Sequence, residues 1–110
     1  MPEHWVRVRR LDTLEDRSII PVVVEGTHLL LVRDGPRVYA TERACPHEGA
    51  DLAAGRYVHG KLFCPRHLAW FDLKNGRVGG GWDFRPLRTY RTTIIDEVIY
   101  VGMQSLRTDS

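Results

Sequence analysis

Apolar and charged residues alternate near the start of the chain, which is the pattern of a strand with one buried face. Val6 and Val8 are apolar, and the charged residues Arg7 and Arg9 follow each of them in turn. Successive side chains of a strand point to opposite faces of its sheet. The alternation therefore predicts a half-buried strand over 4–10.

Short β-branched and aromatic runs separated by turn residues follow along the rest of the chain. The segment 11–18 is polar and acidic, and we expect a loop anchored only by Leu14. Pro21 within the next apolar run indicates an edge strand or a bulge, and Asp34-Gly35 is a strong hairpin signal. Further strands are predicted over 19–24, 28–33, 38–40, 56–58, 61–63, 70–73, 87–95 and 98–101.

No stretch of the sequence has a sustained helical period, so helix is expected only in short turns. The order of the predicted hairpins indicates an all-β protein. We expect one domain over 1–110, in which both chain ends form the base and a small subdomain is inserted at about 43–86. A length of 110 residues allows one modest core and no separate catalytic module.

Composition places the chain among ordinary globular proteins, with 43% hydrophobic and 27% charged residues. The longest apolar run, 19–24, is far too short to cross a membrane, and the N-terminus has no signal-like apolar region. The net charge of +2 is spread along the chain without a continuous basic stripe. These features predict a cytoplasmic protein that binds neither nucleic acid nor membrane.

The two cysteines of the chain each begin a short motif that also contains a histidine. Cys45-Pro46-His47 is followed after sixteen residues by Cys64-Pro65-Arg66-His67. Two thiolates and two imidazoles supplied as matched pairs from two loops make a metal site the leading hypothesis. His4, His28 and His59 have no second ligand at useful spacing and are interpreted as surface residues.

The spacing of the ligand pairs favours two metal ions over one. A single zinc ion is usually held by pairs that are two to five residues apart, whereas Cys45 and His47 are separated by one residue. In an extended backbone such side chains are rooted roughly 6.6 Å apart, which suits two irons bridged by sulfide. A zinc knuckle, or two buried cysteines with unrelated histidines, remain alternatives.

At these residues the chain resembles the Rieske family, and its small size makes it similar to the soluble Rieske-type ferredoxins. The resemblance is specific between about 44 and 86. It implies a Rieske fold, with an antiparallel β-sandwich base and an inserted cluster-binding subdomain. It also implies that Cys45 and Cys64 hold the buried iron of one 2Fe-2S cluster, while His47 and His67 hold the outer iron. Residues 79–86 match a third loop that covers the cluster.

Four departures from the high-potential members of the family predict a low reduction potential. Ala50 and Arg66 stand where those members have two cysteines that form a disulfide. Ala69 and Phe71 stand where they have hydroxyl side chains that donate hydrogen bonds to cluster sulfur. Such hydrogen bonds stabilise the reduced cluster, so their loss places the expected potential near the low end of the Rieske range, at roughly −150 mV.

The resemblance implies an electron carrier and not an enzyme. The chain would accept single electrons from an NAD(P)H-dependent flavoprotein ferredoxin reductase and deliver them to a terminal oxygenase, often one that acts on aromatic compounds. The sequence contains no nucleophile elbow, phosphate loop or dinucleotide fingerprint, and we expect a monomer. The alternatives are a small Rieske subunit of a larger redox enzyme such as nitrite reductase, or a zinc-stabilised Cys2His2 binding module.

Overall fold

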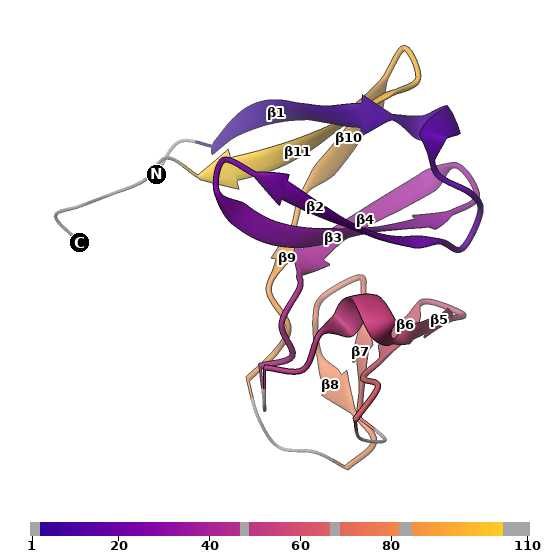
Figure 1. The fold of residues 1–110 in the computed structure, drawn as a ribbon, viewed down its shortest axis with the longest axis vertical. Helices are drawn as coiled ribbons and strands as arrows, with labels where there is room; N and C mark the ends of the chain where they lie inside the picture. Colours follow the sequence, from indigo (N-terminus) through magenta and orange to yellow (C-terminus); the bar gives the residue numbers. More distant parts are fainter. Residues whose placement is uncertain (1–2, 47–48, 67–68, 82–84, 105–110) are drawn as a thin grey trace, which may run out of the picture.

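The computed structural model describes residues 3–46, 49–66, 69–81 and 85–104. Within these ranges the chain forms three antiparallel sheets and two single turns of 3₁₀ helix, as Figure 1 shows. Two of the sheets form the base of the molecule, and the third forms a smaller body below it (Figure 1). The all-β prediction and the antiparallel base with an inserted subdomain are confirmed.

Both ends of the described chain meet in the first sheet of the base, whose strand order is β1-β11-β10. β1 pairs with β11 along its whole length, with an irregular register between Arg7 and Arg9. The alternating sequence of β1 therefore forms a half-buried strand, as predicted. The three strands are β1 (Glu3–Arg10), β10 (Thr92–Ile95) and β11 (Val98–Gln104).

The second sheet of the base has the order β2-β3-β4-β9. β2 is an edge strand, which explains how it accommodates Pro21 without leaving a ladder hydrogen bond unmade. The β2–β3 turn places Glu25 and Gly26 at positive φ, as a tight two-residue hairpin requires. The four strands are β2 (Ile19–Val24), β3 (Thr27–Asp34), β4 (Arg37–Glu42) and β9 (Thr89–Tyr90).

Strand β3 is buried on both faces and contributes to two separate cores. Leu29 and Leu31 pack between the two sheets of the base, together with Ile99 of β11. Leu30 and Val32 point the other way and pack against the smaller body. The run of four apolar residues in β3 follows from this double burial, because a strand exposed on one face would alternate.

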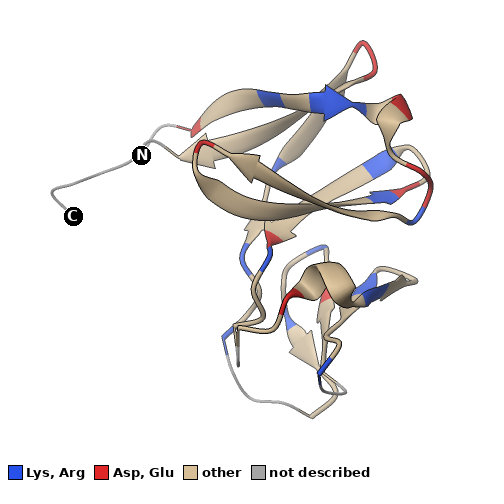
Figure 2. Cartoon of the chain, viewed as in Figure 1, with Lys and Arg blue, Asp and Glu red and all other residues tan. Residues whose placement is uncertain are grey.

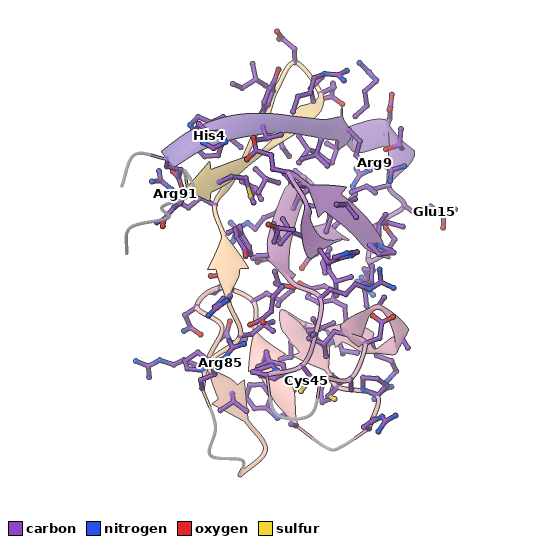
Figure 3. The ribbon with its side chains drawn as sticks, turned by 60° about the vertical axis from the view of Figure 1, so that its left-hand side comes forward. His4, Arg9, Glu15, Cys45, Arg85 and Arg91 are labelled. Carbon is purple, nitrogen blue, oxygen red and sulfur yellow. The ribbon has the colours of Figure 1, made fainter. Side chains whose placement is uncertain are left out.

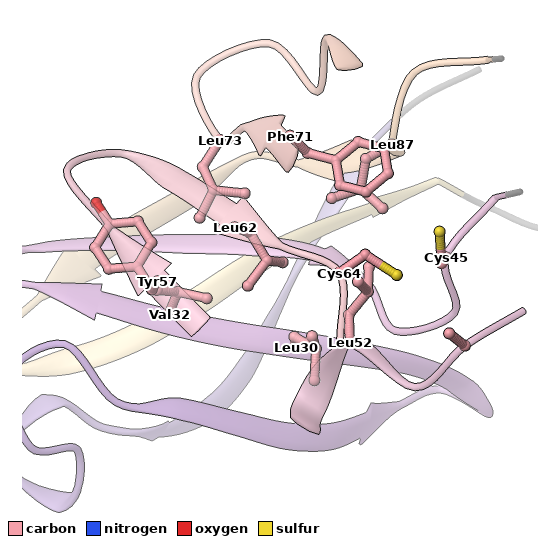
Figure 4. Packing of buried hydrophobic residues seen from close by; sticks show 11 residues of the cluster. Leu30, Val32, Cys45, Leu52, Tyr57, Leu62, Cys64, Phe71, Leu73 and Leu87 are labelled. Atoms are coloured by element: carbon pink, nitrogen blue, oxygen red, sulfur yellow. The ribbon is translucent and has the colours of Figure 1, made fainter. Parts of the chain in front are cut away.

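The smaller body consists of a four-stranded sheet and a 3₁₀ turn that cover the outer face of β3. Its sheet order is β5-β6-β7-β8, and Tyr57, Leu62 and Phe71 project from it into the core shown in Figure 4. The Tyr57 hydroxyl donates a 2.6 Å hydrogen bond to Asp34 at the end of β3, which ties the two bodies together. The strands are β5 (Arg56–Val58), β6 (Lys61–Phe63), β7 (Trp70–Asp72) and β8 (Val78–Gly79).

Two sequence-based expectations need correction. The strand predicted over 87–95 is divided at Arg91 into β9, which pairs with β4, and β10, which pairs with β11. The chain crosses there from one sheet of the sandwich to the other, and Thr92 Oγ1 donates to the Val38 carbonyl across the corner (2.6 Å). Pairing with two different sheets is a tertiary effect that the local pattern does not contain.

The loop after β1 is also better anchored than predicted. It begins with a 3₁₀ turn (η1, Leu11–Thr13), and both Leu11 and Leu14 are buried. The Arg33 guanidinium donates to the carbonyls of these two leucines at 3.2 and 2.8 Å. No helix in the described part of the chain is long and apolar enough to cross a membrane.

Candidate metal centre

The two cysteines occupy equivalent places in two loops of similar construction. Cys45 lies shortly after β4, and its N–H donates to the carbonyl of Ala50 at 2.8 Å. Cys64 follows β6 directly, and its N–H donates to the carbonyl of Ala69 at 3.0 Å. Each loop is therefore closed by a bond from its own cysteine to the fifth residue along the chain. A third bond, from Gly49 N–H to the Cys45 carbonyl (2.8 Å), tightens the first loop.

Both thiol groups are buried at the same end of the smaller body. Cys45 is 2% exposed and Cys64 is 4% exposed, and neither takes part in a disulfide bond. Figure 4 shows their sulfur atoms on adjacent loops at the edge of the apolar core, beside Leu52 and Phe71. The structure thus brings the two predicted cysteine ligands together, although nineteen positions of the sequence separate them.

The chemistry of this pair fits the cysteine half of a 2Fe-2S site. A thiolate is costly to bury among apolar side chains unless a cation compensates its charge. Two thiols that face a common region without forming a disulfide can share one iron, as the cluster requires. His47 and His67, the other two predicted ligands, lie outside the described residues, as does the 82–84 part of the third loop.

The first loop is braced by an ion pair that the sequence analysis missed. Arg43 donates to both carboxylate oxygens of Asp51, at 2.9 Å each, and Asp51 also accepts from the N–H of Ala53 at 3.0 Å. The hydrogen bonds from Arg43 and Ala53 lower the pKa of Asp51 to about 2. Asp51 thereby caps the second 3₁₀ turn (η2, Leu52–Ala54) and joins the two ends of the first loop.

A glycine allows that turn to approach the second loop. Gly55 ends η2 beside the Phe63 carbonyl, and a Cβ on Gly55 would collide with this carbonyl oxygen. Phe63 is the residue before Cys64. The close approach therefore helps to set the separation between the two cysteine loops.

Glu42 and Arg85 connect the first ligand loop with the returning end of the third loop. The Arg85 guanidinium donates to the two oxygens of Glu42 at 2.7 and 2.9 Å. One of these oxygens also accepts from the N–H of Arg88 at 2.7 Å. Burial raises the pKa of Glu42, but the bonds from Arg85 and Arg88 outweigh it, so the pKa lies below its ordinary value.

The sequence contained no signal for this contact, because Glu42 and Arg85 are 43 residues apart. Figure 2 shows an acidic position at the end of β4, flanked by basic positions on the two segments that join the base to the smaller body. Only the fold brings these charges together.

The two positions that lack hydroxyl groups are fully buried. Ala69 and Phe71 are both 0% exposed, in the second ligand loop and the following strand. Arg66, between the predicted ligands of that loop, is exposed.

The chain matches the model of the family described as the Rieske [2Fe-2S] domain over residues 4–91. It belongs to the Rieske family. The match spans both cysteine loops, the base strands before them and the segment after them, so this Rieske domain carries one 2Fe-2S cluster of the Rieske type.

Relatives with similar sequences are ferredoxin components of dioxygenase systems. The Rieske chain is 26% identical to the ferredoxin component of the naphthalene 1,2-dioxygenase system of Pseudomonas aeruginosa, over 94% of this chain and 99% of the relative. It is 31% identical to the corresponding component of Pseudomonas putida, over 86% of this chain and 90% of the relative.

Solved structures agree on the fold. The ferredoxin of carbazole 1,9a-dioxygenase from Nocardioides aromaticivorans IC177 superposes with a TM-score of 0.82 at 31% identity, over 88% of this chain and 95% of that chain. A putative NADH-dependent nitrite reductase small subunit from Mycobacterium tuberculosis superposes with a TM-score of 0.83 at 18% identity, over 96% of this chain and 100% of that chain. The second likeness shows a shared fold alone.

Proposed function

We propose that this Rieske domain is a low-potential ferredoxin that carries single electrons from an NAD(P)H-dependent flavoprotein reductase to a terminal oxygenase acting on aromatic compounds. The main support is the match in length and sequence to the ferredoxin components. The chain corresponds to nearly the whole of such a component, with 99% of the Pseudomonas aeruginosa relative covered.

In this proposal Cys45 and Cys64 hold the buried iron, and His47 and His67 hold the outer iron. The bound cluster supplies a one-electron couple. The polypeptide supplies a rigid and dry setting, because both cysteine loops are closed by their own backbone bonds and the thiols are buried. A protein environment that changes little between the oxidised and reduced states lowers the reorganisation energy of electron transfer.

The proposed low potential is supported by the buried, hydroxyl-free side chains of Ala69 and Phe71. Neither side chain can donate a hydrogen bond to cluster sulfur. Because hydrogen bonds to sulfur raise the potential, we place this protein near the lower end of the Rieske range.

The proposed delivery of electrons to an oxygenase is supported by a third solved structure. It is a complex of reduced oxygenase and oxidised ferredoxin in carbazole 1,9a-dioxygenase. A chain of that complex superposes on this protein with a TM-score of 0.82 at 26% identity, and 97% of that chain is covered. We further propose that the protein works in the cytoplasm as a monomer and docks on acidic partner surfaces, given its net charge of +2.

The proposal is tested with purified protein and a reconstituted electron-transfer chain. We expect a red-brown protein with iron and acid-labile sulfide, and, after reduction, an electron-spin signal with the low average g value of mixed nitrogen and sulfur ligation. It should then support product formation when mixed with NADH, a ferredoxin reductase and an aromatic-ring oxygenase. Cys64→Ala is the matched control that should support none.

Three results separate this proposal from its rivals. A colourless protein that contains zinc would identify a zinc-stabilised binding module. Stable co-purification with a nitrite reductase, without electron delivery to any oxygenase, would identify a small subunit of that enzyme. A coloured protein that no reductase can reduce would exclude the carrier role.

A further inference from the structure

Glu42 is mostly buried, and hydrogen bonds hold both its side chain and its backbone. It is the last residue of β4, three positions before Cys45, and its side chain is only 14% exposed. Besides the bonds from Arg85 and Arg88 to its carboxylate, its own N–H donates to the Arg88 carbonyl at 2.9 Å. Glu42 therefore holds the 85–88 segment through both its backbone and its side chain.

The same segment is held from its other side by the turn between β7 and β8. The N–H of Leu87 donates to the Gly76 carbonyl at 2.8 Å, and Leu87 is buried in the core of the smaller body. Gly76 has a φ of +77°, and a Cβ there would collide with the Leu87 carbonyl. The 85–88 segment is thus held by Glu42 on one side and by the Gly76 turn on the other.

Arg85 contacts Glu42 at 2.7 Å, and Glu42 is three positions before the predicted iron ligand Cys45. The hydrogen bond to Glu42 is the main cause that raises the pKa of Arg85, and negative charge at Cys45 raises it further. Figure 3 shows Arg85 and Cys45 at the same end of the molecule, below the base. The interaction is mutual, so a cation stabilised by charge at Cys45 also stabilises negative charge at that sulfur.

We propose that Glu42 and Arg85 form a compensated charge pair, which keeps the reduction potential of the cluster close to the value it would have without either charge. Reduction adds one negative charge to the cluster. Arg85 favours that charge, and Glu42, held beside Arg85, offsets most of this effect. The pair therefore fixes the 85–88 segment while it adds little net charge near the cluster. The inference rests on the cluster and on Cys45 as its ligand, and it does not depend on which redox partners are used.

Opposite shifts from the two single substitutions are the distinctive expectation. Glu42→Gln leaves Arg85 uncompensated, so the midpoint potential should rise. Arg85→Gln leaves Glu42 uncompensated, so the potential should fall. We expect each reduction equilibrium to change by about three- to tenfold, which is about 30 to 59 mV for a one-electron couple. The double variant, which lacks both charges, should lie close to the wild type.

The measurement is a redox titration of the loaded protein followed by visible circular dichroism, at fixed ionic strength. Arg10→Gln is the matched control, because Arg10 is also paired with a carboxylate (Asp12, 3.1 Å) and its side chain is 48% exposed, compared with 45% for Arg85. It changes the net charge equally, and Figure 3 shows its neighbour Arg9 on the base, far from Cys45. Arg10→Gln should leave the potential unchanged.

A purely structural role for the pair would give a different result. If the pair only holds the segment in place, removing either partner loosens it and admits water. The midpoint potentials of both single variants would then shift in the same direction, and that outcome overturns the proposal.

If Glu42→Gln fails to assemble a cluster, Arg85→Lys and Arg85→Gln decide between the two roles. The lysine variant keeps the charge and should stay near the wild type, whereas equal shifts in both variants would refute charge compensation. Absence of the electron-spin signal in the wild type would contradict the proposed function itself.

Discussion

The base and the smaller body of this Rieske domain are stabilised in different ways. The base consists mainly of long strands, such as the eight residues of β1 and of β3, whose side chains fill the space between two sheets. The sheet of the smaller body has strands of only two or three residues, which belong to loops closed by backbone bonds, ion pairs and glycine contacts. The apolar core of the smaller body is completed by Leu30 and Val32 of β3. We therefore expect the base to be held by its own strand contacts, and the smaller body to depend on both the base and the cluster.

Loss of the cluster should therefore affect the two regions very unequally, and this is the largest effect we expect. In Cys64→Ala, amide hydrogen exchange in 43–86 should accelerate by about 100-fold or more, because local opening no longer breaks metal bonds. Exchange in β3 and β11 should change far less. Hydrogen exchange followed by mass spectrometry measures both regions in one sample. Equal acceleration everywhere would show that the base is not independently stable.

Truncation of a leucine in the base core tests the other half of the comparison. Leu31 is 0% exposed between the two sheets, and Leu31→Ala should lower the free energy of unfolding by about 2–5 kcal/mol through lost burial and a new cavity. Urea unfolding followed by far-ultraviolet circular dichroism measures the loss. Val23→Ala is the control, because Val23 is 60% exposed on the neighbouring strand β2. A loss below 1 kcal/mol at Leu31 would contradict the assignment of stability to the base core.

The contact between the two bodies can be weakened without touching either core. Tyr57→Phe removes the hydroxyl that donates to Asp34 and leaves the ring in place. We expect a loss of about 1–3 kcal/mol, because the bond joins a partly buried donor to a charged acceptor. Thermal unfolding of the loaded protein gives the value, and Asp34→Asn should lose less because it keeps an acceptor. Equal stability of Tyr57→Phe and the wild type would mean that apolar packing alone joins the bodies.

The smallest effect concerns the ion pair of the first ligand loop and appears as a pH dependence. The pKa of Asp51 is lowered to about 2 in the folded protein, compared with about 3.9 in an unfolded chain. A lowered carboxyl pKa contributes stability above pH 4, and this contribution is lost as the pH falls from about 4 to 2. Asp51 is half exposed, so the contribution is below about 1 kcal/mol.

Asp51→Asn should be slightly less stable than the wild type at pH 7, and the difference should shrink as the pH approaches 2. Urea unfolding at several pH values measures this convergence. Arg10→Gln, which breaks an exposed ion pair on the base, serves as the comparison. A difference that grows toward low pH would contradict the sign of the pKa shift.

The extent of sequence-based prediction also differed between the two regions. The hairpins were predictable because their signals are local. Asp34-Gly35 and His59-Gly60 both lie at turns between paired antiparallel strands. Gly35, His59 and Gly60 have positive φ there. The two motifs that begin at Cys45 and Cys64 were recognisable because each has a histidine two or three positions after its cysteine, which is a local signal in the sequence.

Contacts between distant segments were not predictable. The division of 87–95 between two sheets, the bond from Tyr57 to Asp34 and the pairing of Glu42 with Arg85 all join segments whose proximity is set only by the complete fold. A charged residue that will form such a contact has the same local sequence signal as one that remains in solvent. The charges that we propose act on the centre are therefore among those that the local sequence does not reveal.

Because β3 is buried on both faces, the inserted segment 43–86 cannot be separated from the base without exposing apolar side chains. The segment 43–86 is continuous in the sequence, yet Leu30 and Val32 of the base complete its apolar core. A peptide that contains only this segment would expose to water the apolar face that packs on Leu30 and Val32. We expect that transplanting this centre onto another scaffold succeeds only if the host supplies an equivalent two-sided strand beneath it.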